Sequence, residues 1–240
     1  MDKNKLVFGL AGLVVGFAIS FFWAKSINKT GLAKTGNDSP MAAAGAAGPA
    51  SAGGQQAAMG SVREKLETAK NNPNDFNAQV DAASVYAQIG RTADAVPFLE
   101  KAYKLDPAQS VKLGIPPYIA QYYSSQNSYA EAEKWYRQDL QAKPDDYEAM
   151  IELGATFIQR EPPDPDKAID YLQSALKGNP RDAHALMHLT EAYLVKKDAR
   201  SAEETLGRLR AANPTNNSIS MLQTKLDDLK AGRPVTIPKD

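Results

Sequence analysis

The residues best suited to chemistry are the chain's two histidines, which lie in the run His184-Ala-Leu-Met-His188-Leu-Thr-Glu191. On a helix, residues three and four positions apart share one face, so two imidazoles and a carboxylate would stand side by side. These groups are common zinc ligands, and a bound zinc ion would support metal-dependent hydrolysis. The default interpretation is that His184, His188 and Glu191 are solvated polar residues of a helix, with no metal bound.

Several features argue against catalysis. Ala185 occupies the position at which the His-Glu-x-x-His motif of metalloproteases carries its general base. The chain has no cysteine, which excludes thiol nucleophiles, thiolate metal sites and disulfides. Motifs for a nucleophile elbow, a phosphate-binding loop or a dinucleotide site are also missing. We therefore predict a protein that is not an enzyme and needs no cofactor.

The charge balance disfavours a polyanionic partner. Lysine and arginine together number 28, and aspartate and glutamate also number 28, so the formal net charge is zero. A surface without excess positive charge has no long-range attraction for phosphate backbones. We expect no nucleic-acid partner.

The histidine helix belongs to a repeat of roughly 34 residues. Each unit contains an aromatic residue, then an alanine, then a large apolar residue four positions further on, and a closing proline. The aromatic residues are Tyr86, Tyr123, Phe157 and Tyr193; the alanines are Ala95, Ala132, Ala168 and Ala202; the apolar residues are Leu99, Tyr136, Leu172 and Leu206; the prolines are Pro107, Pro144, Pro180 and Pro214.

Each unit is expected to form two amphipathic helices, for example 79–88 and 93–105, because its apolar residues follow helical spacing. Alanine is needed where two helix backbones approach closely, and proline ends the second helix. Small insertions at 108–112 and at Glu161-Pro-Pro-Asp-Pro165 fall between helices. One hairpin cannot cover its own apolar face, so the hairpins must stack.

At this point the sequence resembles the tetratricopeptide-repeat (TPR) family. The runs Tyr129-Ala-Glu-Ala-Glu-Lys-Trp-Tyr136 and Asp166-Lys-Ala-Ile-Asp-Tyr-Leu172 look like that family's second helix, and Leu153-Gly154 matches its Leu-Gly pair. The tryptophan of the family's first helix is replaced in all four units, by Gln79, Pro116, Met150 and Leu186. The resemblance implies an all-α fold, a TPR helical-hairpin solenoid or α-α superhelix.

The predicted domain order follows from these features. Residues 1–30 form an N-terminal transmembrane anchor, and residues 31–60 form a disordered linker rich in Ala, Gly and Ser. The solenoid covers 61–230, with an irregular tail at 231–240. Its repeats are 76–109, 113–146, 147–182 and 183–216, and its capping helices are 61–72 and 217–230.

The resemblance implies that the first helices line a concave groove for a protein or peptide partner. Helical spacing and the family's geometry assign the groove to a mixed apolar and polar set. An alternative for each member is packing against the neighbouring second helix. The set is Val80, Ser84, Gln121, Ile151, Ala155, Ile158, Met187, Glu191 and Leu194.

The N-terminal anchor is predicted from residues 6–24, which carry no charge and are long enough to cross a lipid bilayer as a helix. Phe21, Phe22 and Trp23 would lie at the interface. A cleaved signal peptide is the alternative, but Ala24-Lys25-Ser26 is a poor cleavage site. Gly12, Gly16 and Ser20 form a small-residue stripe, for which the hypothesis is association of two such helices as a homodimer. The alternative is a chance spacing, since glycine is common in transmembrane helices.

The function expected from the sequence is that of a protein-binding adaptor in the bacterial inner membrane, with its TPR domain in the periplasm. Lysines flank the predicted span on both sides, so the periplasmic orientation rests on the resemblance alone. Similar anchored TPR proteins take part in cytochrome c biogenesis and envelope assembly, and the resemblance implies such a role here. The alternatives are a self-assembling structural TPR protein and a metal-dependent hydrolase that uses His184, His188 and Glu191.

Overall fold

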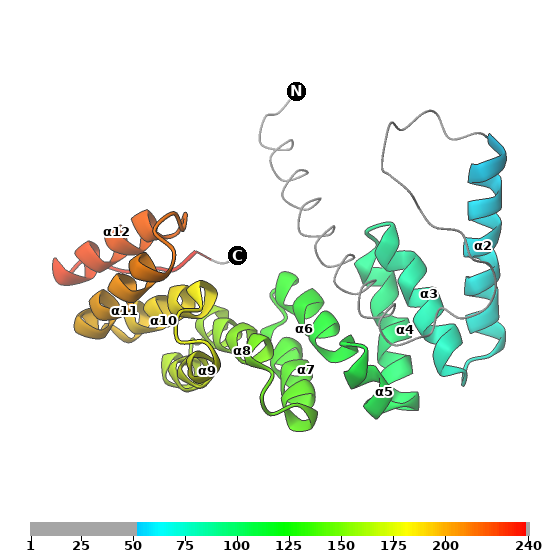
Figure 1. Cartoon of the computed structure of the whole chain (residues 1–240), viewed down its shortest axis with the longest axis horizontal. Helices are drawn as coiled ribbons and strands as arrows, with labels where there is room; N and C mark the ends of the chain where they lie inside the picture. Colours follow the sequence, from blue (N-terminus) through cyan, green and yellow to red (C-terminus); the bar gives the residue numbers. More distant parts are fainter. Residues whose placement is uncertain (1–51, 239–240) are drawn as a thin grey trace. The chain divides into compact units, whose positions relative to one another are not determined.

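The computed structural model describes residues 52–238, and helices are the only regular secondary structure in that range. Eleven helices, α2 to α12, follow one another along the described chain (Figure 1). They fall into two compact units, one ending at Ile115 and the other beginning at Pro116. We describe each unit by itself.

The first unit contains α2 (Ala52–Asn71), α3 (Phe76–Gln88), α4 (Thr92–Leu105) and the short α5 (Pro107–Lys112). Helix α3 packs against both α2 and α4. Gln79 of α3 is buried, and its side-chain amide donates hydrogen bonds to the backbone oxygens of Ala69 (2.9 Å) and Asn72 (3.3 Å) at the end of α2. A polar side chain therefore fastens these two helices where the resemblance expects a tryptophan.

The second unit contains seven helices. They are α6 (Ile115–Ser125), α7 (Tyr129–Ala142), α8 (Tyr147–Gln159), α9 (Pro165–Gly178), α10 (Ala183–Lys196), α11 (Ala199–Ala212) and α12 (Ile219–Lys230). From α7 onward each helix packs against the next, and α10 also packs against α8 and α12. The contacts of α10 with α8 and α12 place the first helices of successive hairpins beside one another, as a stack of hairpins requires.

The repeat markers lie where the sequence predicts close packing. The four marker alanines have no exposed surface, and the large apolar residues that follow them are at most 1% exposed. Each marker proline lies two residues beyond the end of a helix, namely α4, α7, α9 or α11. The prediction of an all-helical hairpin fold is confirmed for the described residues.

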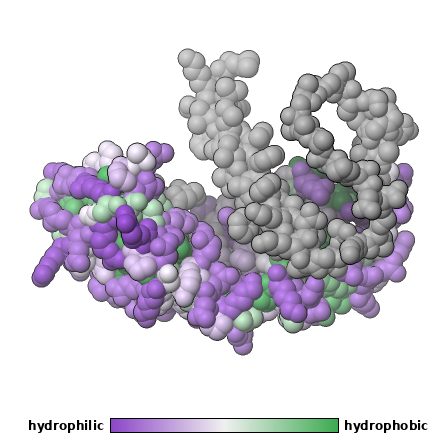
Figure 2. Space-filling model, viewed as in Figure 1, coloured by the Kyte–Doolittle hydropathy of each residue, from purple (hydrophilic) through white to green (hydrophobic). Residues whose placement is uncertain are grey.

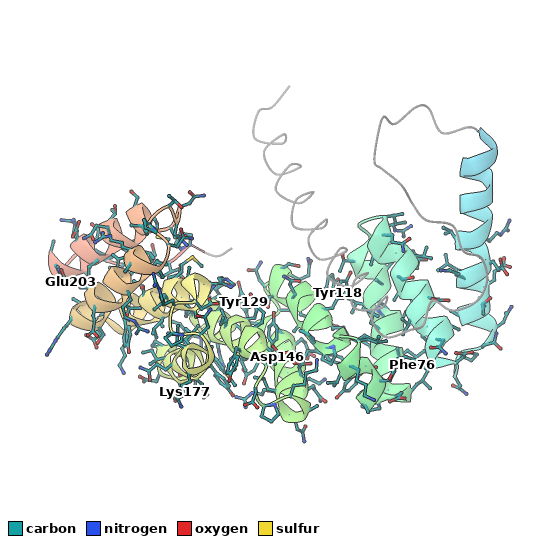
Figure 3. All side chains as sticks on the ribbon, in the orientation of Figure 1. Phe76, Tyr118, Tyr129, Asp146, Lys177 and Glu203 are labelled. Atoms are coloured by element: carbon teal, nitrogen blue, oxygen red, sulfur yellow. The ribbon has the colours of Figure 1, made fainter. Side chains whose placement is uncertain are left out.

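Aspartates begin most of the hairpin helices. The carboxylates of Asp75, Asp146 and Asp182 accept a hydrogen bond from the backbone N–H three residues further on, at the starts of α3, α8 and α10. Asp164 and Asp198 do the same at the starts of α9 and α11. Figure 3 labels Asp146 at the start of α8. These bonds satisfy backbone donors that the first turn of a helix leaves unpaired.

Two segments differ from their prediction. Helix α2 begins at Ala52 and so includes residues 52–60, which the sequence analysis places in the disordered linker. Ala57, Ala58 and neighbouring glutamines are good helix formers, and they extend the helix that follows. The insertion at 108–112 is also helical, because Asp106 caps it and Pro107 occupies its first turn.

The predicted membrane anchor lies outside the described residues, together with Gly12, Gly16 and Ser20. Between residues 52 and 238 no helix has the length and apolar character needed to cross a bilayer. The face of the second unit seen in Figure 2 is mostly hydrophilic over its C-terminal helices. Among the described residues the exposed large hydrophobic side chains are Ile89, Leu105 and Tyr147.

Candidate functional site

Five polar side chains gather where α8 and α10 lie side by side. Glu148 and Glu152 come from α8, whereas His184, His188 and Glu191 come from α10. We call these five residues the α8–α10 cluster. Glu148 and Glu152 are four residues apart, as are His184 and His188, so each pair shares one face of its helix. Contact between the two helices brings the pairs together.

The outer part of the cluster consists of Glu148, Glu152 and His184. Nδ1 of His184 lies 3.9 Å from Oε1 of Glu148 and 3.9 Å from Oε1 of Glu152. One ligand atom from each of the three residues falls within 4.8 Å of the others. The His184 side chain is 42% exposed and the Glu152 side chain is 29% exposed. Solvent and dissolved ions therefore reach this part of the cluster.

The inner part of the cluster supports His184 from behind. Nε2 of His188 lies 3.0 Å from Nε2 of His184, and Nδ1 of His188 lies 2.7 Å from Oε2 of Glu191. His188 and Glu191 are both buried. The three side chains thus form a continuous row of hydrogen-bonding groups that runs from the interior to the surface.

Electrostatics in the cluster favour an uncharged His184. Partial burial of its imidazole, together with the neighbouring His188, lowers the pKa of His184 below its usual value of 6.5. Glu152, Asp182 and Glu191 act in the opposite direction with smaller effect. A neutral imidazole is the form that can donate a lone pair to a metal ion.

The sequence analysis identified part of this cluster. It placed His184, His188 and Glu191 on one helical face, and the structure brings these three residues together. The structure also shows that Glu191 contacts the inner nitrogen of His188, away from the outer residues. Glu148 and Glu152 were missed, although their four-residue spacing on the preceding first helix was visible in the sequence.

The predicted groove residues are mostly inaccessible. Gln121 is exposed and Met187 is half-buried, whereas the other seven are buried. Buried members pack within the helical stack, so they have little surface to offer a partner. The buried residues are Val80, Ser84, Ile151, Ala155, Ile158, Glu191 and Leu194.

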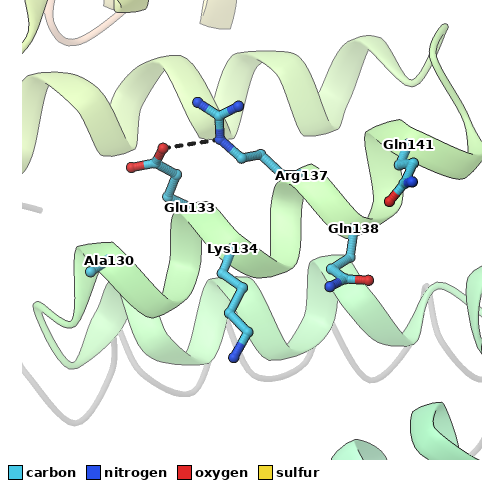
Figure 4. A pocket seen from close by; sticks show the side chains of 6 residues that line it. All are labelled: Ala130, Glu133, Lys134, Arg137, Gln138 and Gln141. Atoms are coloured by element: carbon cyan, nitrogen blue, oxygen red, sulfur yellow. Dashed lines mark hydrogen bonds and ion pairs between the residues drawn. The ribbon is translucent and has the colours of Figure 1, made fainter.

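A hollow lies along α7 (Figure 4). It is lined by Ala130, Glu133, Lys134, Arg137, Gln138 and Gln141. Nε of Arg137 donates to Glu133 at 2.9 Å, and Arg160, the residue after α8, also pairs with Glu133 at 3.3 Å. These charges are matched within the protein, and we assign no function to this hollow.

Comparison with known proteins agrees with the helical hairpins. Residues 76–109 and residues 163–226 each match the tetratricopeptide repeat. These matches place tetratricopeptide repeats at residues 76–109 and 163–226, and the structure forms helical hairpins in both stretches. No curated protein sequence gives a significant match.

Solved structures of similar fold include two described as MamA. "MamA 41-end from Desulfovibrio magneticus RS-1" is 22% identical, with a TM-score of 0.56 over 69% of this chain and 89% of that chain. "Crystal structure of MamA protein" is 17% identical, with a TM-score of 0.52 over 77% of this chain and 91% of that chain. At these identities the likeness concerns the fold alone.

Proposed function

We propose that the chain is a protein-interaction scaffold whose TPR domain binds a protein or peptide partner. The observation that carries this proposal is the stacking of helical hairpins with α8 beside α10. Such stacks offer a continuous surface of first helices to an extended or helical partner.

Four accessible residues of α8 and α10 define the surface to test. They are Glu148 and Glu152 of α8 and His184 and Met187 of α10, and we call them the α8–α10 surface. Met187 adds an adaptable apolar side chain to three polar ones. A partner with an apolar anchor and polar flanks would suit this composition.

A photo-reactive amino acid placed at Met187 of the full-length chain tests this surface. Irradiation of cells should yield a discrete cross-linked product that contains another polypeptide. Glu204, an exposed residue of α11, serves as the matched control position and should give no such product. Failure to cross-link at Met187, or the same product from both positions, would refute binding at the α8–α10 surface. A product that contains a second copy of the chain would favour self-assembly.

We also propose that residues 6–24 anchor the chain in the bacterial inner membrane. Their uncharged composition and their aromatic residues beside Lys25 support this proposal. Alkaline carbonate should leave the full-length chain in the membrane pellet and release a chain that lacks residues 1–30. Release of the full-length chain would contradict the proposed anchor.

The periplasmic placement of the TPR domain is a further proposal. The resemblance to anchored TPR proteins of cytochrome c biogenesis and envelope assembly supports this placement. The same resemblance supports a role in assembling such complexes. Protease added to spheroplasts should digest the TPR domain while cytoplasmic marker proteins stay intact. Full protection of the domain would place it on the cytoplasmic side.

Gly12, Gly16 and Ser20 stay candidates for homodimer contacts within the membrane.

A further inference from the structure

The inner part of the α8–α10 cluster can support a metal ion on Nδ1 of His184. With an ion on Nδ1, the single proton of the His184 imidazole lies on Nε2, which is 3.0 Å from Nε2 of His188 and can donate to it. Nδ1–H of His188 can then donate to Glu191 across 2.7 Å. Each side chain of the row has a hydrogen-bonding partner in this arrangement.

Two carboxylates lie beside Nδ1 of His184. Nδ1 is 3.9 Å from an oxygen of Glu148 and 3.9 Å from an oxygen of Glu152, so one ring nitrogen and two carboxylate oxygens converge. Within the described part of the chain, the ion pairs found for Glu148 and Glu152 involve His184 and no lysine or arginine. Asp182 adds further negative charge near His184. Such an arrangement is stabilised by a cation.

We propose that Glu148, Glu152 and His184 bind a divalent transition-metal ion of the zinc class, with His188 and Glu191 as positioning residues. Zinc takes nitrogen and carboxylate ligands at about 2.0–2.2 Å, so its ligand atoms lie roughly 3.3 Å apart in a tetrahedron. The two distances from His184 need to shorten by about half an ångström, and the two carboxylate oxygens, which lie within 4.8 Å of each other, need to approach by at most about 1.5 Å. The exposed Glu148 and the partly exposed His184 have room for this movement.

The ligand types select the kind of ion. Mg²⁺ and Ca²⁺ prefer oxygen ligands alone, whereas an imidazole beside carboxylates suits zinc and neighbouring transition metals. Glu191 holds His188, and His188 holds His184, so the inner residues act as the outer-shell support that metal-binding histidines usually have. Three protein ligands leave a coordination position open toward solvent. This site does not depend on the proposed partner.

Zinc titration of the full-length chain, without an added polyhistidine tag, tests the proposal in competition with a chromogenic chelator. The chain has two histidines and no cysteine, so a histidine-bound zinc ion can lie only in this cluster. We expect one zinc ion per chain. His184→Gln and Glu152→Gln should each weaken zinc binding at least 100-fold, and the exposed control Glu204→Gln should leave it unchanged.

Glu191→Gln tests the positioning role separately. Loss of an outer-shell partner typically weakens metal binding about 10–100-fold. In the metal-free chain, imidazole ¹⁵N chemical shifts should also show that His188 no longer carries its proton fixed on Nδ1. A merely structural role for Glu191 would leave that tautomer unchanged.

Circular dichroism distinguishes loss of zinc binding from misfolding. His184 and Glu152 are partly exposed, so their variants should keep the helical signal of the wild type. If either variant misfolds, Glu148→Gln replaces it, because Glu148 is exposed. The proposal is overturned if no stoichiometric zinc binds at tens of micromolar metal. It is also overturned if folded His184→Gln binds zinc as tightly as the wild type.

Discussion

Individual residues of this protein depart from the usual separation of apolar interior and polar surface. Gln79 is buried but satisfied, because its amide donates to the backbone oxygens of Ala69 in α2 and of Asn72 just after α2. Asp139 of α7 is buried without this compensation, since neither carboxylate oxygen has a hydrogen-bond partner among the described residues. Its nearest cation is Nζ of Lys143 at 3.5 Å. Burying a poorly paired carboxylate costs free energy, so Asp139 should destabilise the native state when it is ionised.

The pH dependence of stability should reveal Asp139. Burial raises the pKa of Asp139 from 3.8 to about 6, despite the opposing effect of Lys143. Between these pH values the folded chain holds a proton that the unfolded chain has released. The contribution of Asp139 to stability is therefore present below pH 3.8 and is lost as the pH rises to about 6.

Asp139→Asn removes this titration while keeping the shape of the side chain. The difference in unfolding free energy, variant minus wild type, should increase by about 2–3 kcal/mol as the pH rises from 4 to 7. Urea unfolding at several pH values measures this difference. Comparing the two proteins at each pH cancels titrating groups that do not interact with Asp139, including His184, whose lowered pKa acts in the opposite direction. A constant difference across this range would contradict the assignment.

At the scale of elements, the spacing between paired helices depends on small residues. Gly154 of α8 lies against Leu172 of α9, and a Cβ atom at Gly154 would come within 2.7 Å of the Leu172 side chain. Leu172 is completely buried and has little room to move. Gly207 of α11 has open space at the corresponding position of its Cβ. The two glycines therefore separate the packing effect of an added methyl group from its effect on helix propensity.

Alanine substitutions at the two glycines should have opposite effects. Gly154→Ala should lower the unfolding free energy by about 1–3 kcal/mol, because overpacking outweighs the gain in helix propensity. Gly207→Ala should raise it by up to about 1 kcal/mol. Urea unfolding followed by circular dichroism gives both values. Stabilisation by both substitutions would show that α8 and α9 are not closely packed at Gly154.

For the whole molecule, stability depends on each hairpin covering its neighbour. Helix α12 covers the last hairpin. It packs against α11 and α10, and its Leu222 and Leu226 are buried. Without α12, helices α10 and α11 would lose part of their cover. End segments of repeat proteins commonly protect the final apolar face in this way.

A chain that ends at Asn216 tests the role of α12. Loss of two buried leucines should lower the unfolding free energy of the second unit by about 3 kcal/mol or more, and the exposed face should promote association. Urea unfolding and size-exclusion chromatography measure these two effects. A chain that lacks only residues 234–240 is the control and should behave like the full-length protein. Equal stability of both truncated chains would contradict a capping role.

The sequence was sufficient to predict the repeat and its hairpins. Alanine, large apolar residues and proline recur at fixed intervals, because close helix packing and helix termination impose local requirements in every unit. Helices α3, α4 and α7 to α11 follow this pattern closely. The helical start of α2 was less accessible to sequence reasoning, since alanine-rich and glycine-rich segments lack an apolar period that marks a packed face.

Only the tertiary structure decided which polar residues meet. The sequence placed His184, His188 and Glu191 on one helix, since helical spacing links residues close in sequence. It did not place Glu148 and Glu152 beside them, because that contact depends on how α10 packs against α8. The same packing buried Ile151 and Leu194, which helical spacing alone could not distinguish from groove residues. Helical periodicity determines the direction of a side chain, whereas packing between helices determines its neighbours.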